Sequence, residues 1–172
     1  MDHRENDLIA QAQKGDVAAF EALVRCYQDR LWRIAVQIVG DGDDAQDVCQ
    51  ECLIKVFRSL CTFRAGERFS VWLYRIAVNA AIDFRRRQRK RGQVALSEEL
   101  PDRGGPSVEL RILLEAVLEQ LSPKQRSAFV LRDLQGFSLA EIAHILRCSK
   151  VTARVHLFRA RKVIREKVGQ ES

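Results

Sequence analysis

Two closely spaced helix starts near the carboxyl end of the chain constrain its fold more than any other feature. Ser122–Gln125 has the pattern of a capping box with proline in the first turn, and Ser138–Glu141 is a second box. Gly136, between them, suits the left-handed residue that ends a helix. After a break at Arg147–Ser149, a long helical pattern begins at Lys150. A short helix, a tight turn and a second helix predict a helix-turn-helix.

The residues of that last helix separate into an apolar face and a cationic face. The apolar residues recur at helical spacing and should face the core: Ala153, Leu157, Ala160, Ile164 and Val168. The opposite stripe is mostly basic: Lys150, Arg154, Phe158, Arg161 and Arg165. A cationic second helix fits the major groove of DNA. An ordinary helical hairpin with a solvated basic face is the alternative, but the caps, the spacing and the charge together favour DNA binding.

The positive charge of the chain lies in two separate segments. Among 172 residues there are 29 Lys and Arg against 23 Asp and Glu. Nine basic and two acidic residues lie between Arg64 and Arg91, and eight basic and one acidic lie between Arg147 and Lys167. Each segment therefore carries a net charge of about +7, and the rest of the chain about −8. This distribution predicts two surfaces that hold one polyanion.

Several classes of protein are disfavoured by the composition. No apolar run approaches the roughly 18–20 residues that span a bilayer, and the amino end lacks the pattern of a signal peptide. We therefore expect a cytoplasmic protein without direct membrane insertion. The cysteines are odd in number and lack the spacing of a disulfide framework, which indicates reduced thiols. They are Cys26, Cys49, Cys52, Cys61 and Cys148.

Cys49 and Cys52 have the spacing of half a zinc site. They lie inside a helical pattern, no second pair is present and no histidine is close in sequence. We interpret both as small buried hydrophobic residues and expect neither a metal ion nor any other cofactor. A redox- or metal-sensing regulator is the function that this interpretation sets aside.

Helical periodicity runs through the first ninety residues, without convincing strand alternation. A short amphipathic helix is expected over residues 8–12, followed by one helix from Asp16 to Gly40. The apolar stripe of that second helix is Phe20, Leu23, Val24, Tyr27, Leu31, Ile34, Ala35 and Ile38. A third helix opens in the acidic cluster 41–44, which suits a helix amino end. Its expected buried side is Cys49, Leu53, Val56, Phe57 and Leu60.

A fourth helix, capped by Ser70, ends in the basic run 85–91. Its expected core residues are Leu73, Ile76, Ala77, Ala80 and Phe84. Composition then changes, because residues 92–107 contain three glycines and two prolines without helical period. The predicted fold class is therefore all-α, with two small helical domains. A four-helix bundle (residues 1–91) and a helix-turn-helix domain (residues 108–172) are joined by a flexible linker (residues 92–107).

Aromatic and basic side chains alternate ahead of the arginine run. The aromatic residues are Phe63, Phe69, Trp72 and Tyr74, and the basic ones are Arg64, Arg68 and Arg75. Aromatic rings stack on unpaired bases while arginines follow the backbone, so the segment suits single-stranded or distorted DNA. These rings could instead be core, as we accept for Phe69 and in part for Trp72. Phe63 lies in an irregular, glycine-containing stretch, where we expect an exposed ring with a function.

Two further features have either a functional interpretation or an interpretation as ordinary solvent-exposed residues. Asn79 is a poor helix former in mid-helix, so its amide either meets a base edge or faces solvent. An acidic series would repel DNA and marks either a protein-binding surface or a solvated helix face. Its members are Asp41, Asp43, Asp44, Asp47 and Glu51.

Several segments occur in the order found in the sigma factors of bacterial RNA polymerase. The blocks that resemble the second sigma region are 44–51 (DAQDVCQE), 54–57 (IKVF), 63–64 (FR) and 72–79 (WLYRIAVN). The blocks that resemble the fourth region are 121–123 (LSP), 131–132 (LR), 142–143 (IA) and 158–161 (FRAR). Only the predicted linker separates the two sets. The chain therefore resembles, over nearly its whole length, the two-domain extracytoplasmic-function (group 4) type.

The resemblance implies a role for each signal in the first domain. The acidic helix would dock on the clamp helices of the polymerase β′ subunit through Asp44, Asp47, Gln50, Glu51 and Lys55. The loop after it and the fourth helix would capture unstacked bases of the −10 promoter element, with Phe63 near the flipped base. The residues implied in this contact are Phe63, Arg64, Trp72, Arg75, Asn79, Arg85 and Arg86.

The last helix would read the −35 element as duplex. The residues implied are Lys150, Thr152, Arg154, His156, Phe158, Arg159 and Arg161. Members of the family often have Gly-Thr-Val-(Lys/Arg)-Ser-Arg at the start of this helix, where this chain has VTARVH at 151–156. Arg154 keeps the basic position, but Val155 and His156 replace a small hydroxyl and an arginine. Since a bidentate guanidinium contact is worth about 1–3 kcal/mol of base discrimination, the −35 preference stays open.

The resemblance also implies the partners. They are core RNA polymerase (β′ clamp helices and β flap), promoter DNA in duplex and single-stranded form, and an anti-sigma factor that could hold the protein at the inner membrane. No nucleophile–base pair or glycine-rich phosphate loop is evident, so we expect no enzyme activity. A free-standing repressor or activator that uses only the helix-turn-helix is the rival from another class.

Overall fold

The computed structural model describes residues 3–64, 66–91 and 108–168. Within these ranges all regular elements are helices, which confirms the all-α class. A first module consists of α1 (His3–Gln13), α2 (Val17–Arg25), α3 (Gln28–Val39), α4 (Gly42–Ser59) and α5 (Phe69–Arg91), with a 3₁₀ turn at Leu60–Thr62. A second module consists of α6 (Val108–Glu119), α7 (Pro123–Phe129), α8 (Leu139–Ile145) and α9 (Lys150–Val168), with a π-helical turn at Val130–Leu134. The predicted linker, 92–107, lies outside the described residues.

The helix expected from Asp16 to Gly40 is two helices, so that prediction was wrong. The Asp16 carboxylate caps α2 by accepting from the backbone N–H of Ala19, as expected, but α2 ends at Arg25 and α3 begins at Gln28. At the break, the Tyr27 ring packs against Phe69 of α5 at 5.5 Å between centroids. The apolar stripe is still mostly buried on both sides of the break, because α2 leans on α1 while α3 packs on α4 and α5.

The buried face of α4 is also rotated by about one position from the expected one. Its buried residues are Ala45, Val48, Cys52 and Val56, which face α3 and α5. Cys49 and Leu53 are only half-buried, and Phe57 is 38% exposed. Small side chains in the line 45-48-52-56 let α4 lie between two neighbours, which turns the larger residues outward. The acidic start is confirmed, since Asp41 accepts a hydrogen bond from the backbone of Asp44 at 2.9 Å.

The thiols of Cys49 and Cys52 behave as hydrophobic groups. Burial raises the pKa of Cys49 to about 11 and that of Cys52 to about 12. A thiolate, which binds metals and reacts with oxidants, is therefore disfavoured at both positions. This supports the interpretation of Cys52 as core, whereas Cys49 only lines its edge.

Several local features of the second module form where the sequence predicts them. Both capping boxes are formed, with reciprocal bonds between Ser122 and Gln125 and between Ser138 and Glu141. Gly136 takes a left-handed backbone (φ 74°). The predicted break between α8 and α9 is present, and Arg147 within it has φ 49°. The π-helical turn that extends α7 has no counterpart in the sequence patterns.

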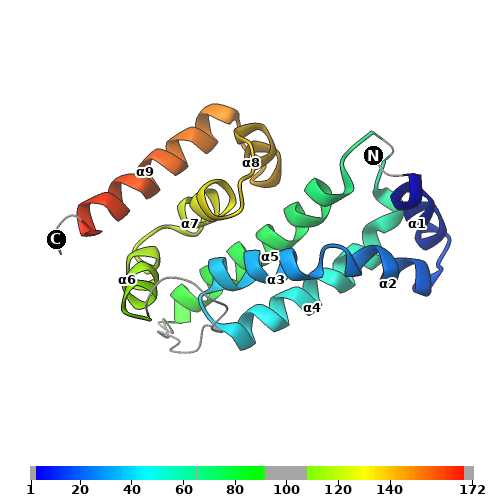
Figure 1. The fold of residues 1–172 in the computed structure, drawn as a ribbon, viewed down its shortest axis with the longest axis horizontal. Coiled ribbons are helices and arrows are strands. Elements are labelled where there is room, and N and C mark those ends of the chain that lie inside the picture. The colour runs from blue at the N-terminus through cyan, green and yellow to red at the C-terminus, as the bar shows by residue number, and fades with distance from the viewer. Residues whose placement is uncertain (1–2, 65, 92–107, 169–172) are drawn as a thin grey trace.

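The two modules pack directly on each other. Helices α7 and α8 lie against α5, α7 also touches α3, and α9 packs on the outer side of α7 and α8 (Figure 1). One continuous apolar core therefore runs from α1 through α5 into α7, α8 and the start of α9. A smaller core of Leu118, Leu121 and Ala160 joins α6 to α9. Sequence patterns predicted two tethered modules and gave no sign of this contact.

Candidate nucleic-acid and protein interfaces

The second helix of the helix-turn-helix, α9, presents an open cationic face. Ala153, Leu157 and Ala160 are buried, as predicted for the core side. The opposite side is solvent-exposed along Lys150, Thr152, Arg154, Phe158, Arg159, Arg161 and Arg165. Phe158 is 65% exposed and Val151 69% exposed, and nothing in the described part of the chain covers them. The helix thus offers charge and apolar contact area to a groove-shaped partner.

His156 and Arg161 differ from the other predicted contacts on α9. His156 is half-buried, and this burial, with the charges of Lys124 and Arg159, lowers its pKa, so the imidazole is neutral at neutral pH. Arg161 is fixed to Asp133 by two bonds, Nε to Oδ2 at 3.0 Å and Nη2 to Oδ1 at 2.5 Å. Hydrogen bonding to Asp133 raises the pKa of Arg161. This planar, two-bond pairing holds the guanidinium in one direction on the surface.

Phe63 is buried, which corrects the expectation of an exposed ring. It is 7% exposed and meets Phe69 and Trp72 edge-on, at 5.5 Å and 5.4 Å between ring centroids. The side chain of Gln13 on α1 donates to the backbone oxygen of Phe63 at 3.1 Å, which fixes the loop. The glycine in this stretch, Gly66, adopts φ 104° and lets the chain fold back. The edge contacts of Phe63 with two neighbouring rings outweigh the irregular backbone that suggested exposure.

The other residues predicted to contact the −10 element fall into two groups: some are exposed to solvent, and others are buried or hydrogen-bonded within the chain. Arg64 and Arg86 are exposed. Trp72 is 4% exposed and Arg85 3% exposed, so neither is free to contact a ligand in this arrangement. Asn79 is half-buried, and its amide donates to the backbone oxygen one turn earlier, at Arg75.

Arg75 and Arg85 are held by acidic or polar groups. Arg75 Nη1 lies 2.9 Å from Glu67 Oε1 and 2.7 Å from His144 Nε2 of α8. Arg85 Nη2 donates to Glu119 Oε2 of α6 at 2.6 Å. Both contacts to the second module occupy side chains that the sequence assigned to DNA.

The acidic helix α4 turns a mixed face to solvent. Asp47 and Gln50 are exposed, and Glu51 accepts from Lys55 at 2.6 Å, a contact that lowers the pKa of Glu51. Asp44 is half-buried and accepts from Gln88 of α5 at 2.8 Å. Burial and the neighbouring carboxylates raise the pKa of Asp44.

Sequence reasoning missed an apolar part of this face. Ile54 is 52% exposed and Phe57 38% exposed, next to Glu51 and Lys55. A groove of about 730 Å³ lies between α3 and α4, with Trp32, Gln50 and Leu53 among its lining residues. Charged residues around a small apolar centre are typical of a protein-binding surface. The off-by-one assignment of the α4 core placed Phe57 inside and hid this signal.

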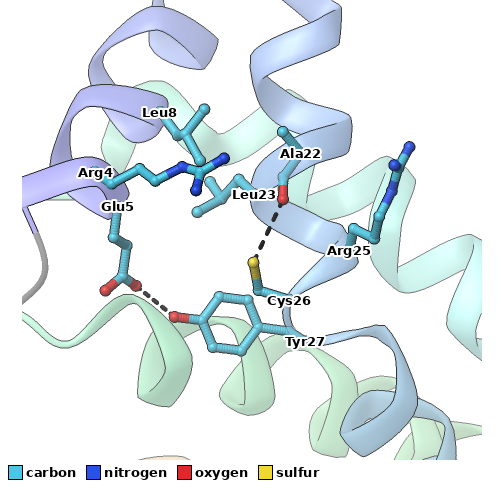
Figure 2. Close-up of a pocket in the computed structure, with 8 residues that line it drawn as sticks. All are labelled: Arg4, Glu5, Leu8, Ala22, Leu23, Arg25, Cys26 and Tyr27. Carbon is cyan, nitrogen blue, oxygen red and sulfur yellow. Dashed lines mark hydrogen bonds between the residues drawn. The ribbon is translucent and has the colours of Figure 1, made fainter.

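A second hollow, of about 500 Å³, lies at the junction of α1, α2 and the start of α3 (Figure 2). The hydroxyl of Tyr27 donates to the Glu5 carboxylate across its floor, and the Cys26 thiol contacts the backbone oxygen of Ala22 at 3.6 Å. Burial and the Glu5 carboxylate raise the pKa of Tyr27. The bond ties α1 to the break between α2 and α3, so we treat this hollow as structural.

Two features are absent from the described residues. Within ranges 3–64, 66–91 and 108–168, no helix is long and apolar enough to cross a membrane. Over the same residues, no group of three His, Cys, Asp or Glu side chains is placed to hold a metal ion.

Comparison with known proteins connects this arrangement to one family. The family described as Sigma-70 region 2 matches residues 23–91, and the one described as Sigma-70, region 4 matches residues 111–164. The ECF RNA polymerase sigma-E factor of Escherichia coli K12 is 38% identical, over 94% of this chain and 92% of its own length. The RNA polymerase sigma-H factor of Pseudomonas aeruginosa is 34% identical over the same shares.

Solved structures give the same result. The sigma factor RpoE of Bartonella quintana, in complex with the anti-sigma factor NepR, superposes with a TM-score of 0.74. It is 26% identical and covers 89% of this chain and 98% of its own. CnrH, in complex with the cytosolic domain of CnrY, also has a TM-score of 0.74, at 25% identity and 98% and 99% coverage.

The two family matches leave only short segments of the chain outside them, and the relatives align over nearly their full length. Sigma factors are transcription initiation factors and not enzymes. The chain belongs to the extracytoplasmic-function (ECF) sigma factors, which give bacterial RNA polymerase its promoter specificity.

Proposed function

We propose that residues 1–91 bind core polymerase and the −10 element, that residues 108–172 read the −35 element, and that residues 92–107 link them. One observation carries the proposal: an exposed cationic helix, α9, ends a capped helix-turn-helix, while an exposed acidic helix, α4, lies on the other module. The two faces differ in charge and point to different partners. The sigma factor supplies binding energy, and polymerase performs the chemistry.

For the −35 element, the proposed contacts are the exposed residues of α9. Lys150, Arg159 and Arg161 supply charge for phosphates, and Arg154 supplies a bidentate donor for a base. Val151 and Val155, both exposed, offer apolar contact to thymine methyl groups. Thr152 and Phe158 complete the face, and neutral His156 at its edge can donate or accept one hydrogen bond.

For core polymerase, the proposed contacts are Asp44, Asp47, Gln50, Glu51 and Lys55 of α4, on the β′ clamp helices. We add the exposed Ile54 and Phe57. Apolar side chains that become buried when a complex forms contribute more binding energy than charges at the rim of the interface. The second module would meet the β flap. The charged residues around this centre would set orientation and association rate.

For the −10 element, Arg64 and Arg86 are available in this arrangement, whereas Phe63, Trp72, Arg75, Asn79 and Arg85 need a rearrangement. We propose that the loop after α4 opens when the melted strand arrives, so that a flipped base replaces a neighbouring ring on Phe63. Unstacking a base costs a few kcal/mol, which stacking in the pocket would offset.

The similarity to RpoE, which was solved in complex with the anti-sigma factor NepR, supports a further proposal about regulation. An anti-sigma factor would cover the α4 face or the DNA-binding faces of this chain. The protein would then work in the cytoplasm and be held at the inner membrane whenever that partner carries an anchor.

Run-off transcription with core polymerase on a random promoter library tests the proposal. We expect enriched promoters with two sequence elements and no specific transcription without the chain. Phe63→Ala should impair open-complex formation more than duplex binding, and an equal loss in both assays would remove Phe63 from base capture. Failure to bind core polymerase, together with tight binding of an isolated duplex operator, would favour a free-standing regulator instead.

A further inference from the structure

The side-chain amide of Gln13, the last residue of α1, donates to two backbone oxygens of the loop after α4. Its Nε2 lies 3.0 Å from the Leu60 oxygen and 3.1 Å from the Phe63 oxygen. These oxygens lie at the two ends of the 3₁₀ turn, which the Phe63 N–H closes by donating to the Leu60 oxygen at 3.0 Å. An amide NH₂ carries two hydrogens, so it can serve both acceptors at once. One side chain therefore holds both ends of the turn.

Helix α1 is a firm support for this contact. Ile9 and Ala12 are 5% and 4% exposed and belong to the large apolar core. Nearer the amino end of the helix, Glu5 accepts a hydrogen bond from the Tyr27 hydroxyl (Figure 2). The helix is therefore anchored along its length, and Gln13 donates from a fixed position. The match to Sigma-70 region 2 begins beyond α1, so the support comes from outside the matched segment.

The turn that Gln13 holds separates the side chains of the loop into buried and exposed ones. The Phe63 ring is buried, whereas Cys61 and Thr62, between the two held oxygens, are exposed. Arg64, directly after Phe63, is exposed as well. The Thr62 hydroxyl donates to the Ser59 backbone oxygen at 2.6 Å, which also fixes the direction of that side chain. The loop therefore presents an exposed edge, formed by Cys61, Thr62 and Arg64, in one arrangement.

Side chains with a fixed direction discriminate between partners better than mobile ones. A free loop loses conformational entropy each time it orders on a strand, whereas a loop held by Gln13 has lost that entropy in folding. A mobile loop can also adapt to a wrong base, but a fixed one leaves polar groups unpaired there. Loss of the two bonds should therefore weaken the choice between bases more than the general attraction of a strand, which depends on charge.

We propose that Gln13 is a positioning residue for reading the −10 element: its two bonds fix the 3₁₀ turn, so that the exposed edge meets the melted strand in one geometry. The inference rests on the proposed role of this loop in −10 binding. Gln13 does not itself touch DNA and acts only through the turn. When the loop opens for a flipped base, the backbone from Leu60 to Phe63 stays in place. The movement is then confined to the Phe63 ring and the chain after it.

The test compares changes at two glutamines in the last turn of α1. Gln13→Glu keeps the shape of the side chain but replaces its donor group with an acceptor oxygen, so both bonds are lost. Gln11→Glu is the control, because Gln11 is exposed and gains the same charge in the same helical turn. Gln13→Ala removes the donors without adding charge, and Gln11→Ala is its control. Urea denaturation gives the folded fraction of each full-length protein.

The measurement is the discrimination between two promoters by holoenzyme assembled from each protein and core polymerase. One promoter is enriched in the random library, and the other differs only at the −10 base whose replacement slows opening by wild type most. Permanganate reactivity of melted thymines gives the rate of opening on each promoter, and the ratio of the two rates measures discrimination. We expect this ratio to fall roughly fivefold in both Gln13 variants, the factor that one net hydrogen bond contributes, and to stay unchanged in both Gln11 variants. A smaller folded fraction would slow opening on both promoters equally, so a purely structural role would leave the ratio unchanged.

The inference is overturned if the Gln13 variants have the same ratio as their Gln11 controls, whether the ratio stays at the wild-type value or falls in both pairs. Should the Gln13→Glu protein fail to fold, Gln13→Ala against Gln11→Ala decides. Discrimination by wild type that persists in the Gln13 variants rejects the positioning role and leaves the proposed function intact. If wild type opens promoters at the same rate whatever their −10 bases, the proposed −10 role fails, and this inference fails with it.

Discussion

Two segments of this chain carry the same net charge of about +7, yet the structure treats them in opposite ways. Helix α9 turns its basic residues to solvent, and among the described residues only Arg161 of its predicted contacts is held by a carboxylate outside the helix, Asp133. Helix α5 is covered on several sides, and its Arg75 and Arg85 are bonded to the second module. The charge counted along a sequence therefore shows which segments can attract a polyanion. Tertiary packing decides whether the polyanion can contact the charged side chains.

The largest difference should appear at two phenylalanines predicted to meet DNA, Phe63 directly before the first segment and Phe158 in the second. Phe63→Ala removes a buried ring from a three-ring cluster and should lower the free energy of unfolding by about 3 kcal/mol. Phe158→Ala removes an exposed ring from α9 and should change stability by less than about 0.5 kcal/mol. Urea denaturation measures both, and a large loss for Phe158 would contradict the open face.

The next difference should appear at adjacent arginines of α5. Arg85→Gln breaks a buried charged hydrogen bond to Glu119 and should cost about 2 kcal/mol of stability. Arg86→Gln, on an exposed side chain 3.6 Å from Asp83, should have no measurable effect. The same urea series serves for both proteins, and equal midpoints would mean that the Arg85 contact contributes nothing.

On the exposed face of α9, Arg154→Ala should reduce transcription from promoters with an intact −35 element. A lost bidentate base contact is worth about 1–3 kcal/mol, so a reduction of about tenfold is expected. A promoter that lacks the −35 element is the control, and its weak transcription should not change. Unaltered use of the intact promoter would remove Arg154 from the reading surface.

The smallest expected effect concerns Asp133, which holds Arg161 on the open face. The pair is partly exposed, so Asp133→Asn should lower stability by less than about 1 kcal/mol. It should also change affinity for duplex DNA only slightly, since Arg161 keeps its charge but loses its fixed direction. Titration of a labelled −35 duplex at two salt concentrations measures this, with Glu166→Gln as the charge-matched control.

The sequence was a good guide wherever one residue acts on its immediate neighbours. The Ser122 and Ser138 capping boxes, the left-handed Gly136 and the break before Lys150 all depend on residues within one turn, and all are present. The buried side of α9 was also predicted correctly at Ala153, Leu157 and Ala160, because a long helix with regular spacing defines its own buried face. Ile164 is half-buried, and the side chain of Val168 lies outside the described residues.

Distant contacts account for the predictions that were wrong. The break at Tyr27 depends on Phe69 and Glu5, which are far away in the sequence. The burial of Phe63 depends on Trp72 and on Gln13 of α1. No local pattern contains this information.

The candidate site was predictable to a different extent in each module. The exposed positions of α9 follow from periodicity, as Lys150 and Arg154 illustrate. For α5, the residues facing the second module follow only from tertiary packing, so Arg85 was assigned to DNA although it is 3% exposed here. The assignment of these residues to promoter DNA stays a prediction.

Gly40 ends α3 in a left-handed conformation (φ 94°). The sequence also predicts that a helix ends at this residue. A methyl group at this position would lie 2.7 Å from the Glu115 carboxylate oxygen and 3.3 Å from Arg126 Nη2. The residue that terminates α3 therefore also lies directly against side chains of the second module. One added methyl group at this position would push the Glu115 and Arg126 side chains away from α3, so the residue that ends a helix also sets the spacing between the two modules.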